Sequence, residues 1–326
     1  MAGDRDLAVA IVRALRTQGS SLRTGWEMTA ASGIRGLRLV AEAGPFDAFL
    51  LTEAHPRAFE VLAANAAGRP GVRARAADAR RPWAGERFDY VDLDPYGSPL
   101  PFLGAALGAV REGGVLAVTA TDMMVLAGAQ PAACRRLYGA NPVRGRLGPE
   151  GGLRILLGHL AGRARALGRS VRPRVAYVRE HHVRAYLTID PARGSADPVG
   201  TIDPLRWDGP PLGGQETLGP MWLGPLFDGE TIRAMERYAG AHRPEELATF
   251  VDRFREESEV DVPFYYESNS LARALGLPAP PKLTAMLDGL RSEGFRAART
   301  HVRPEGFRTD APRPRVEAAA RRLVGR

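Results

Sequence analysis

A regular alternation of short apolar segments with amphipathic helical segments, between residues 24 and 122, limits the fold of this chain most strongly. Residues 114–122, for example, form a nearly unbroken apolar run that begins with glycine and ends with aspartate, as a buried strand does. The predicted strands lie around Trp26 and at residues 46–53, 72–76, 86–91 and 114–122. The predicted helices lie at residues 7–15, 34–42, 57–65 and 102–110, the first with Asp4 or Asp6 as its N-cap. Strands that alternate with helices of this length predict a parallel, doubly wound α/β sheet.

The octet Asp92-Leu93-Asp94-Pro95-Tyr96-Gly97-Ser98-Pro99 closes one of these strands and is the main candidate site. In an open α/β sheet, ligands bind at the carboxyl ends of the strands. The carboxylate of Asp94 and the carbonyls around Pro95 can accept hydrogens from an exocyclic amine, and Tyr96 can stack on a planar base. A plain turn is the alternative, since Asp-Pro and Tyr-Gly are common in turns. The position at the sheet edge favours the site.

A small-residue turn at residues 30–36 is the second candidate site. Small residues allow a ligand to approach the backbone, and the helix that follows offers free N–H groups. Glu53 ends the next strand about 20 residues later, where an acid can hold the ribose hydroxyls of a dinucleotide or of S-adenosylmethionine. Asp78, followed by Ala79, ends the third strand and can accept from an adenine amine. The chain has no G-x-G-x-x-G, and its central acid lies on the fourth strand, so a class I methyltransferase is favoured over a dehydrogenase.

The charge of the chain indicates a polyanionic partner. The formal net charge is +8, and all but one of the 45 lysine and arginine residues are arginine. Arginine suits bidentate phosphate contacts, although a GC-rich genome would give the same bias. No apolar run approaches the roughly twenty residues needed to span a bilayer, and no signal-peptide pattern is present. We therefore expect a nucleic acid, and not a membrane, as the partner.

The sequence offers little for a metal site. Cys134 is the only cysteine, which excludes an internal disulfide and a zinc site of several cysteines. His181 and His182 lie between two predicted antiparallel strands at residues 175–178 and 185–189, and adjacent strand residues point to opposite faces. We expect no metal, and the single cysteine favours a cytoplasmic location.

The C-terminal part of the chain predicts a second, smaller and mostly helical domain. Residues 190–220 are rich in proline, glycine and aspartate and are predicted to be a linker, and the apolar segment 221–226 is predicted to dock on the first domain. We place the domains at residues 1–225 and 226–326. Predicted helices lie at residues 231–239, 244–257, 270–275 and 282–293, and two short strands at residues 295–301 and 306–309.

Helix, turn, helix and hairpin at residues 270–309 form a winged-helix-like arrangement, which often presents basic residues to nucleic acid. The basic residues on or near this hairpin are Arg296, Arg299, Arg303 and Arg308. A protein-contact module is the alternative interpretation. The net positive charge favours nucleic acid.

Six dispersed motifs resemble the tRNA N2,N2-dimethylguanosine methyltransferases, which modify guanine 26. They are the octet 92–99, the turn 30–36, Thr119-Ala120-Thr121-Asp122, Glu150-Gly151 with Leu153-Arg154-Ile155-Leu156, Trp222-Leu223-Gly224-Pro225-Leu226, and Arg299-Thr300-His301 with Thr309-Asp310-Ala311. The resemblance covers nearly the whole chain in order. It implies S-adenosylmethionine-dependent transfer of one or two methyl groups to a guanine amine of tRNA by a class I (Rossmann-like) sheet.

The resemblance also implies roles for single residues. Asp94 matches the catalytic aspartate, with Pro95 and Tyr96 beside it, and general-base assistance of this kind is worth about 10²–10⁴-fold. The implied cofactor contacts are Arg5, Ser32, Gly33, Arg35, Glu53, Asp78, Ala79 and Asp92. The predicted tRNA contacts are Tyr96, which would stack on a base that has left its helix, and Arg299, His301, Arg303 and Arg308. The pattern alone, without the resemblance, favours a solvated charge in a first helical turn for Arg5.

The chain departs from the family pattern in several places. The family usually has some thirty more residues before Asp4, Glu27 stands where an aspartate is usual, and Tyr96 replaces a common phenylalanine. The cysteine zinc site of some relatives is absent, and Pro149-Glu150 stands where the family has a His-Glu pair.

Two alternatives stay open: an amino-methyltransferase acting on adenine or cytosine, and a winged-helix regulator that only senses S-adenosylmethionine. We expect a monomer.

Overall fold

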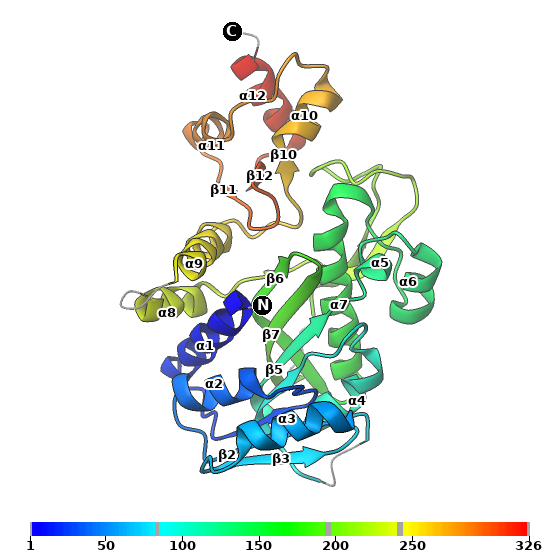
Figure 1. The fold of residues 1–326 in the computed structure, drawn as a ribbon. Coiled ribbons are helices and arrows are strands. Elements are labelled where there is room, and N and C mark those ends of the chain that lie inside the picture. Colours follow the sequence, from blue (N-terminus) through cyan, green and yellow to red (C-terminus); the bar gives the residue numbers. More distant parts are fainter. Residues whose placement is uncertain (1, 82–84, 193–196, 240–243, 325–326) are drawn as a thin grey trace.

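The computed structural model describes residues 2–81, 85–192, 197–239 and 244–324, and its centre is a seven-stranded sheet (Figure 1). The strand order is β3-β2-β1-β4-β5-β7-β6. Strands β1 to β5 are parallel, while β7 runs antiparallel to both β5 and β6. The strands are β1 (Thr24–Glu27), β2 (Ala48–Glu53), β3 (Val72–Ala76), β4 (Phe88–Leu93), β5 (Val110–Ala120), β6 (Arg169–Arg179) and β7 (His182–Pro191). This is the predicted class I sheet with a final antiparallel pair.

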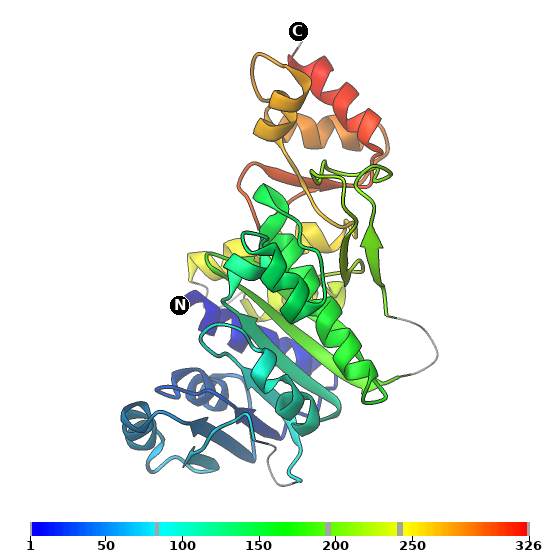
Figure 2. The ribbon, with the colours of Figure 1, turned by 90° about the vertical axis from the view of Figure 1, so that its right-hand side faces the viewer.

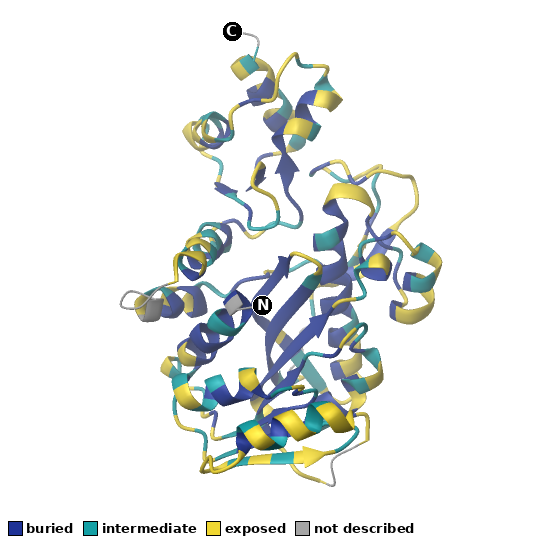
Figure 3. Cartoon of the chain, in the orientation of Figure 1, coloured by how far each residue is buried: buried dark blue, intermediate teal, exposed yellow. Residues whose placement is uncertain are grey.

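Helices cover both faces of the sheet (Figure 2). The first helix and α8 (Gly229–Ala239) pack together on one face, while α7 packs against β6 and β7 on the other. The helices of this part are α1 (Ala2–Thr17), α2 (Ile34–Glu42), α3 (Pro56–Ala66), α4 (Leu103–Ala109), α5 (Met123–Leu126), α6 (Pro131–Tyr138) and α7 (Gly148–Arg165), with short 3-10 turns η1 (Leu100–Phe102) and η2 (Gly145–Leu147). The central strands and the inner helix faces are buried, whereas α3 presents an exposed outer face (Figure 3).

The predicted elements are present with small shifts in their ends, and three expectations differ. The first helix begins at Ala2, so Asp4 and Asp6 lie inside it and neither is its N-cap. The predicted linker contains two paired strands, β8 (Val199–Ile202) and β9 (Leu218–Trp222). Two helices, α6 and the one at residues 313–324, were not predicted from the sequence.

The apolar segment that begins at Met221 docks on the first domain, as predicted. Met221 is fully buried, and its backbone runs so close to Gly158 of α7 that a Cβ there would lie 3.0 Å from the Met221 Cα. Glycine at this position therefore lets β9 lie directly against α7. The contact anchors the segment between the two parts of the chain.

Two separate hydrophobic cores divide the chain near residue 265. The larger core takes in the sheet, its helices and also α8 (Gly229–Ala239) and α9 (Glu245–Ser258). The smaller core extends from Tyr266 to Ala320. The helices α8 and α9 follow residue 225 in the sequence, but their apolar faces belong to the larger core. The domain boundary between residues 225 and 226 therefore stays a prediction.

The smaller core is enclosed by a three-stranded sheet of order β10-β12-β11 and three helices, at the end of the molecule away from β3 (Figure 1). These elements are β10 (Tyr266–Glu267), α10 (Ser268–Leu275), α11 (Leu283–Ser292), β11 (Ala297–Arg299), β12 (Gly306–Thr309) and α12 (Arg313–Val324). The predicted helix pair and hairpin are therefore present. Whether they act as a winged helix remains a prediction.

Candidate active site

A cleft of about 290 Å³ opens at the carboxyl ends of β1, β4 and β5, where the strand order of the sheet reverses. In doubly wound sheets this switch point is the usual ligand site. The lining residues are Asp4, Arg5, Glu27, Thr29, Ala30, Ala31, Ser32, Ile34, Arg35, Asp94, Thr119, Thr121, Glu180, His182 and Arg184. The fold thus brings Asp94 of the octet, the small-residue turn and Arg5 of the first helix to one cleft, and their roles in binding stay predictions.

Asp94 lies in the cleft, and its carboxylate is paired with Arg35 of α2. Arg35 Nη1 donates a hydrogen bond to Asp94 Oδ2 and lies 3.7 Å from Asp92 Oδ1. The Asp94 backbone N–H donates to the Thr29 hydroxyl over 3.3 Å. Burial raises the pKa of Asp94, but Arg35 and Arg184 outweigh it and hold that pKa below its usual value. The side chain is therefore an ionised carboxylate that accepts hydrogen bonds.

Asp92 occupies a deeper position than the sequence analysis assigned to it. Its side chain is fully buried, and its Oδ2 accepts hydrogen bonds from Arg184 Nη2 at 2.7 Å and from the Tyr90 hydroxyl at 2.6 Å. The prediction that Asp92 contacts the cofactor is therefore corrected. It supports the site from behind by neutralising the buried guanidinium of Arg184.

Arg184, which the sequence analysis missed, holds the floor of the cleft together. It reaches the site from β7, and its side chain is 1% exposed. It donates to the Tyr186 hydroxyl at 2.9 Å and to Thr119 Oγ1 at 2.5 Å, in addition to its pair with Asp92. An arginine within an apolar strand was the only signal for it in the sequence.

Glu27, at the end of β1, is another carboxyl group that lines the cleft. Its Oε2 accepts the Gly36 N–H at 2.9 Å, and a Cβ at Gly36 would lie 2.7 Å from that oxygen. Complete burial raises the pKa of Glu27 to about 8, although Arg35 acts in the opposite direction. Glu27 can therefore hold a proton near neutral pH and release it when a cation enters the cleft.

The small-residue turn is fixed by Glu53 at the end of β2. Glu53 accepts the Ala31 N–H at 2.9 Å and the His55 N–H at 2.8 Å, and Ala31 has a left-handed φ of 47°. Gly33 also has a positive φ, of 75°, which glycine adopts without strain. Ser32 and this turn form one wall of the cleft, while Glu53 itself lies just behind it.

Asp78 and Ala79 do not line the cleft, although they end the neighbouring strand β3. The carboxylate of Asp78 pairs with Arg80 at 2.5 Å, and this pair lowers the pKa of Asp78 to about 2. Ala79 is buried. Their assignment to the adenine remains a prediction.

Tyr96 projects completely into solvent, with a relative exposure of 103%. The turn that carries it is firmly held, because Gly97 N–H donates to Thr121 Oγ1 at 2.7 Å and the Thr121 N–H donates to the Gly97 carbonyl at 3.0 Å. Pro95 precedes it at the end of β4. The aromatic ring is therefore presented on a rigid support beside Asp94, free to take a stacking partner.

Arg5 lines the cleft from α1. Its neighbour Asp4 is almost buried and accepts a hydrogen bond from the Tyr177 hydroxyl at 3.3 Å. The Asp4 carboxylate also lies 3.2 Å from Arg179 Nη1 of β6 and 3.2 Å from His182 Nε2 of β7. This cluster pins the start of α1 over the sheet, which places Arg5 at the cleft.

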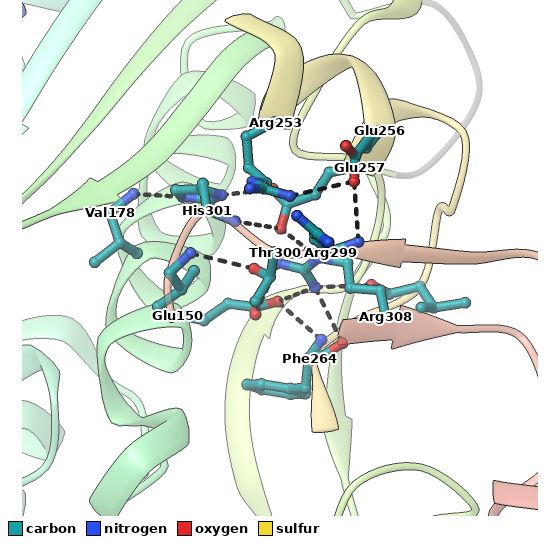
Figure 4. Close-up of polar contacts among 12 residues, drawn as sticks. Glu150, Val178, Arg253, Glu256, Glu257, Phe264, Arg299, Thr300, His301 and Arg308 are labelled. Carbon is teal, nitrogen blue, oxygen red and sulfur yellow. Dashed lines mark hydrogen bonds and ion pairs between the residues drawn. The ribbon is translucent and has the colours of Figure 1, made fainter. Parts of the chain in front are cut away.

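The side chains of Arg308 and His301 are buried, contrary to the prediction that they contact tRNA. Arg308 is 2% exposed and pairs with Glu150 of α7 at 2.9 Å and with Glu257 of α9 at 3.1 Å (Figure 4). The side chain of His301 is 1% exposed; its Nδ1 bonds to Glu257 and its Nε2 accepts the Val178 N–H at 3.0 Å. These side chains join the C-terminal hairpin to the first domain, and no RNA can reach them there.

The other two predicted tRNA contacts of the hairpin lie nearer the surface. Arg303 is exposed and Arg299 is half-buried.

Within the described part of the chain, no cluster of histidine, cysteine and acidic side chains could hold a metal ion. Nor is any described helix long and apolar enough to cross a bilayer.

The open, mostly parallel sheet, with its cleft at the switch point and an ionised acid after the fourth strand, defines a class I methyltransferase fold. The chain belongs to the N2,N2-dimethylguanosine tRNA methyltransferase family, because that family model matches residues 1–202 and 212–321. Similar relatives bear the name tRNA (guanine(26)-N(2))-dimethyltransferase. That of Thermococcus kodakarensis is 35% identical over 96% of this chain and 89% of its own. That of Pyrococcus abyssi is 32% identical over the same shares.

A solved structure agrees over nearly the entire fold. Trm1 from Pyrococcus horikoshii, determined with S-adenosyl-L-methionine, matches with a TM-score of 0.85 and 28% identity, over 98% of this chain and 92% of that one. The predicted family and fold class are thereby confirmed.

Proposed function

We propose that this protein transfers methyl groups from S-adenosyl-L-methionine to the exocyclic N2 amine of guanine 26 in tRNA. The family membership and the names of its relatives support the reaction and the substrate. The observation that carries the proposal is the ionised Asp94 carboxylate in a cleft at the switch point of the sheet, with the exposed ring of Tyr96 two residues further on.

The residues of the cleft fit the proposed cofactor. Arg35 Nε is buried and makes no hydrogen bond to a described residue, so a donor is left over for a ligand carboxylate. Glu27 can release its proton when a sulfonium cation enters, because a nearby positive charge lowers the pKa of a carboxyl group. S-adenosylmethionine, when bound, supplies the electrophilic methyl group. We assign Arg5, Ser32, Gly33 and Arg35 to its binding, together with Glu53, Asp78 and Ala79 at the ends of the neighbouring strands.

Asp94 acts on the amine of the guanine. The lone pair of this amine is delocalised into the purine ring, so nitrogen becomes nucleophilic only when an acceptor draws on its proton. Asp94 Oδ2 is paired with Arg35, and its second oxygen, together with the carbonyls near Pro95, can accept from the amine. General-base assistance of this kind contributes about 10²–10⁴-fold.

Tyr96 receives the target base. A guanine in a helix cannot reach a cleft of this depth while stacked, so it must swing out first. The exposed ring at the rim can replace the lost stacking, which is worth about 1–3 kcal/mol per base. Arg35 meanwhile holds the carboxylate in its ionised form.

The C-terminal domain, from residue 226 in our assignment, binds the tRNA. The net charge of +8 and the exposed Arg303 on a winged-helix-like hairpin support this role, as does Arg299 beside it. The monomeric state and the cytoplasmic location stay predictions.

Analysis of the methylated nucleoside tests the proposal. Unmodified tRNA is incubated with the protein and S-adenosylmethionine, digested to nucleosides, and examined by mass spectrometry. We expect N2-methylguanosine and N2,N2-dimethylguanosine from position 26. Methylated adenosine or cytidine would support the alternative amino-methyltransferase, and unmodified tRNA would contradict the proposed reaction.

A further inference from the structure

A second cavity, of about 360 Å³, lies between the first domain and the C-terminal unit. It shares no lining residue with the methyl-transfer cleft. Its walls come from η2, from the loop at residues 210–213, and from β10, α10 and the start of α12. In Figure 1, β10 and α10 lie above the sheet, away from the helices α2 and α3 beside the cleft. The cavity is thus formed only because the two units meet.

The rim of this cavity is cationic. Arg144, Arg146, Arg273 and Arg313 line it, against the two carboxylates Glu267 and Glu317. Arg146 pairs with Glu267 at 2.6 Å and Arg313 pairs with Glu317 at 2.8 Å. Arg144 and Arg273 are exposed, and neither forms an ion pair with any described carboxylate. Two guanidinium groups are therefore available for an anion, and guanidinium is well shaped for phosphate.

The floor of the cavity is apolar and contains one unsatisfied hydroxyl. Leu147, Leu212 and Leu271 line it and are buried. Tyr266 also lines it and is 3% exposed, yet its hydroxyl makes no hydrogen bond to a described residue. A buried polar group without a partner is costly, by about 1–3 kcal/mol, and such groups in native proteins usually serve a ligand or a water molecule.

We propose that this cavity binds one unpaired nucleotide of the tRNA substrate, as an anchor separate from the methyl-transfer cleft. The phosphate lies against Arg144 and Arg273, the base against the leucine floor, and a sugar or base atom accepts the hydroxyl hydrogen of Tyr266. Proteins recognise RNA mainly through such splayed-out nucleotides, whose faces and edges are free. The inference rests on the proposed function, because it takes tRNA as the ligand.

A pair of double variants tests the anchor. Arg144→Ala with Arg273→Ala removes both free cations of the rim. Arg87→Ala with Arg163→Ala removes the same charge from two exposed arginines that line neither cavity and form no ion pair within the described chain. The dissociation constant of tRNA is measured by filter binding at several salt concentrations, with the melting temperature and the KM for S-adenosylmethionine as checks on folding.

We expect the rim variant to bind tRNA about 10- to 100-fold more weakly, as the loss of two partly screened charge-assisted contacts predicts. Its salt slope should fall by about two. The control variant should change the tRNA affinity by less than about threefold, because its two arginines act on the RNA only through long-range electrostatic attraction that salt screens. Tyr266→Phe should weaken tRNA binding without altering the salt slope or lowering the melting temperature.

Equal tRNA affinity of the two double variants would overturn the anchor. This outcome differs from a failure of the proposed function. Wild-type protein that leaves guanine 26 unmethylated would contradict the reaction, while the affinity comparison would still decide on the cavity.

Discussion

At the scale of single residues, the cleft separates two carboxyl groups by their surroundings. Asp94 lies beside Arg35 and Arg184 and stays ionised, whereas burial gives Glu27 a pKa of about 8. Two acids with different proton affinities allow one to accept a hydrogen from the substrate amine while the other responds to the cofactor charge. Arg35 lowers the pKa of both groups, so the difference arises from the complete burial of Glu27 and from the negative charges of Asp92 and Asp94 beside it.

Glu27→Gln is expected to remove a pH dependence of stability. The folded protein holds the Glu27 proton up to about pH 8, while the unfolded chain releases it near pH 4.5. Wild-type stability therefore falls as pH rises from about 4.5 to 8, and the variant avoids this loss. By linkage, the free energy of unfolding of the variant should gain on that of wild type by about 5 kcal/mol at pH 9 and by about 1 kcal/mol at pH 5. Urea titrations at both pH values measure the difference, and a constant difference would contradict it.

Tyr96→Ala is expected to weaken the productive binding of tRNA without loss of stability. The ring makes no buried contact, so the melting temperature should not change. Loss of one stacked base corresponds to a decrease of roughly 5- to 100-fold in kcat/KM for tRNA. Tyr96→Phe keeps the stacking face and serves as the control, with activity near that of wild type. An alanine variant as active as the phenylalanine variant would exclude the stacking role.

At the scale of elements, the C-terminal hairpin is joined to α7 and α9 by a buried ionic network. Arg308 lies between Glu150 and Glu257, and it also donates to the carbonyls of Val262 and Phe264 at 3.2 and 3.0 Å (Figure 4). His301 extends the network to β6. The motifs around Glu150, His301 and Thr309 lie far apart in the sequence, but the fold brings them together in this network.

Arg308→Ala is expected to cost about 3–5 kcal/mol, because it removes the cation shared by two buried carboxylates and leaves Glu150 with Arg154 alone and Glu257 with His301 alone. Arg296→Ala is the matched control on the same hairpin, since the pair of Arg296 with Asp310 is largely exposed. Its loss should cost less than about 1 kcal/mol. Denaturant unfolding measures both values. Equal costs for the two variants would show that the buried network contributes nothing beyond a surface pair.

The pattern along single strands and helices was sufficient to predict the sheet, the turn at residues 30–36 and the position of Asp94 at a strand end. It was not sufficient to assign side chains whose partners are remote. Arg308 on a hairpin has the same sequence pattern whether it faces RNA or another domain, and Arg184 meets Asp92 only when β7 is added beside β5. The strands β8 and β9 were missed because proline and glycine interrupt their alternation.

At the scale of the whole molecule, our two proposals together imply that two units with separate cores hold the substrate at two places. The first domain contains the methyl-transfer cleft, and the C-terminal unit closes the second cavity against it. The ionic network around Arg308 keeps their relative position fixed. A rigid connection of this kind would allow the distance between the anchor and Asp94 to select one nucleotide of the tRNA.

The most direct test of the central claim is single-turnover methyl transfer by Asp94→Asn with saturating tRNA and S-adenosylmethionine. Asparagine keeps the size of the side chain and an acceptor for Arg35, but it cannot take a proton. We predict that the rate constant falls by about 10²–10⁴-fold while the dissociation constants of both ligands change little. A rate constant equal to that of wild type would contradict the assignment of Asp94 as the group that activates the guanine amine.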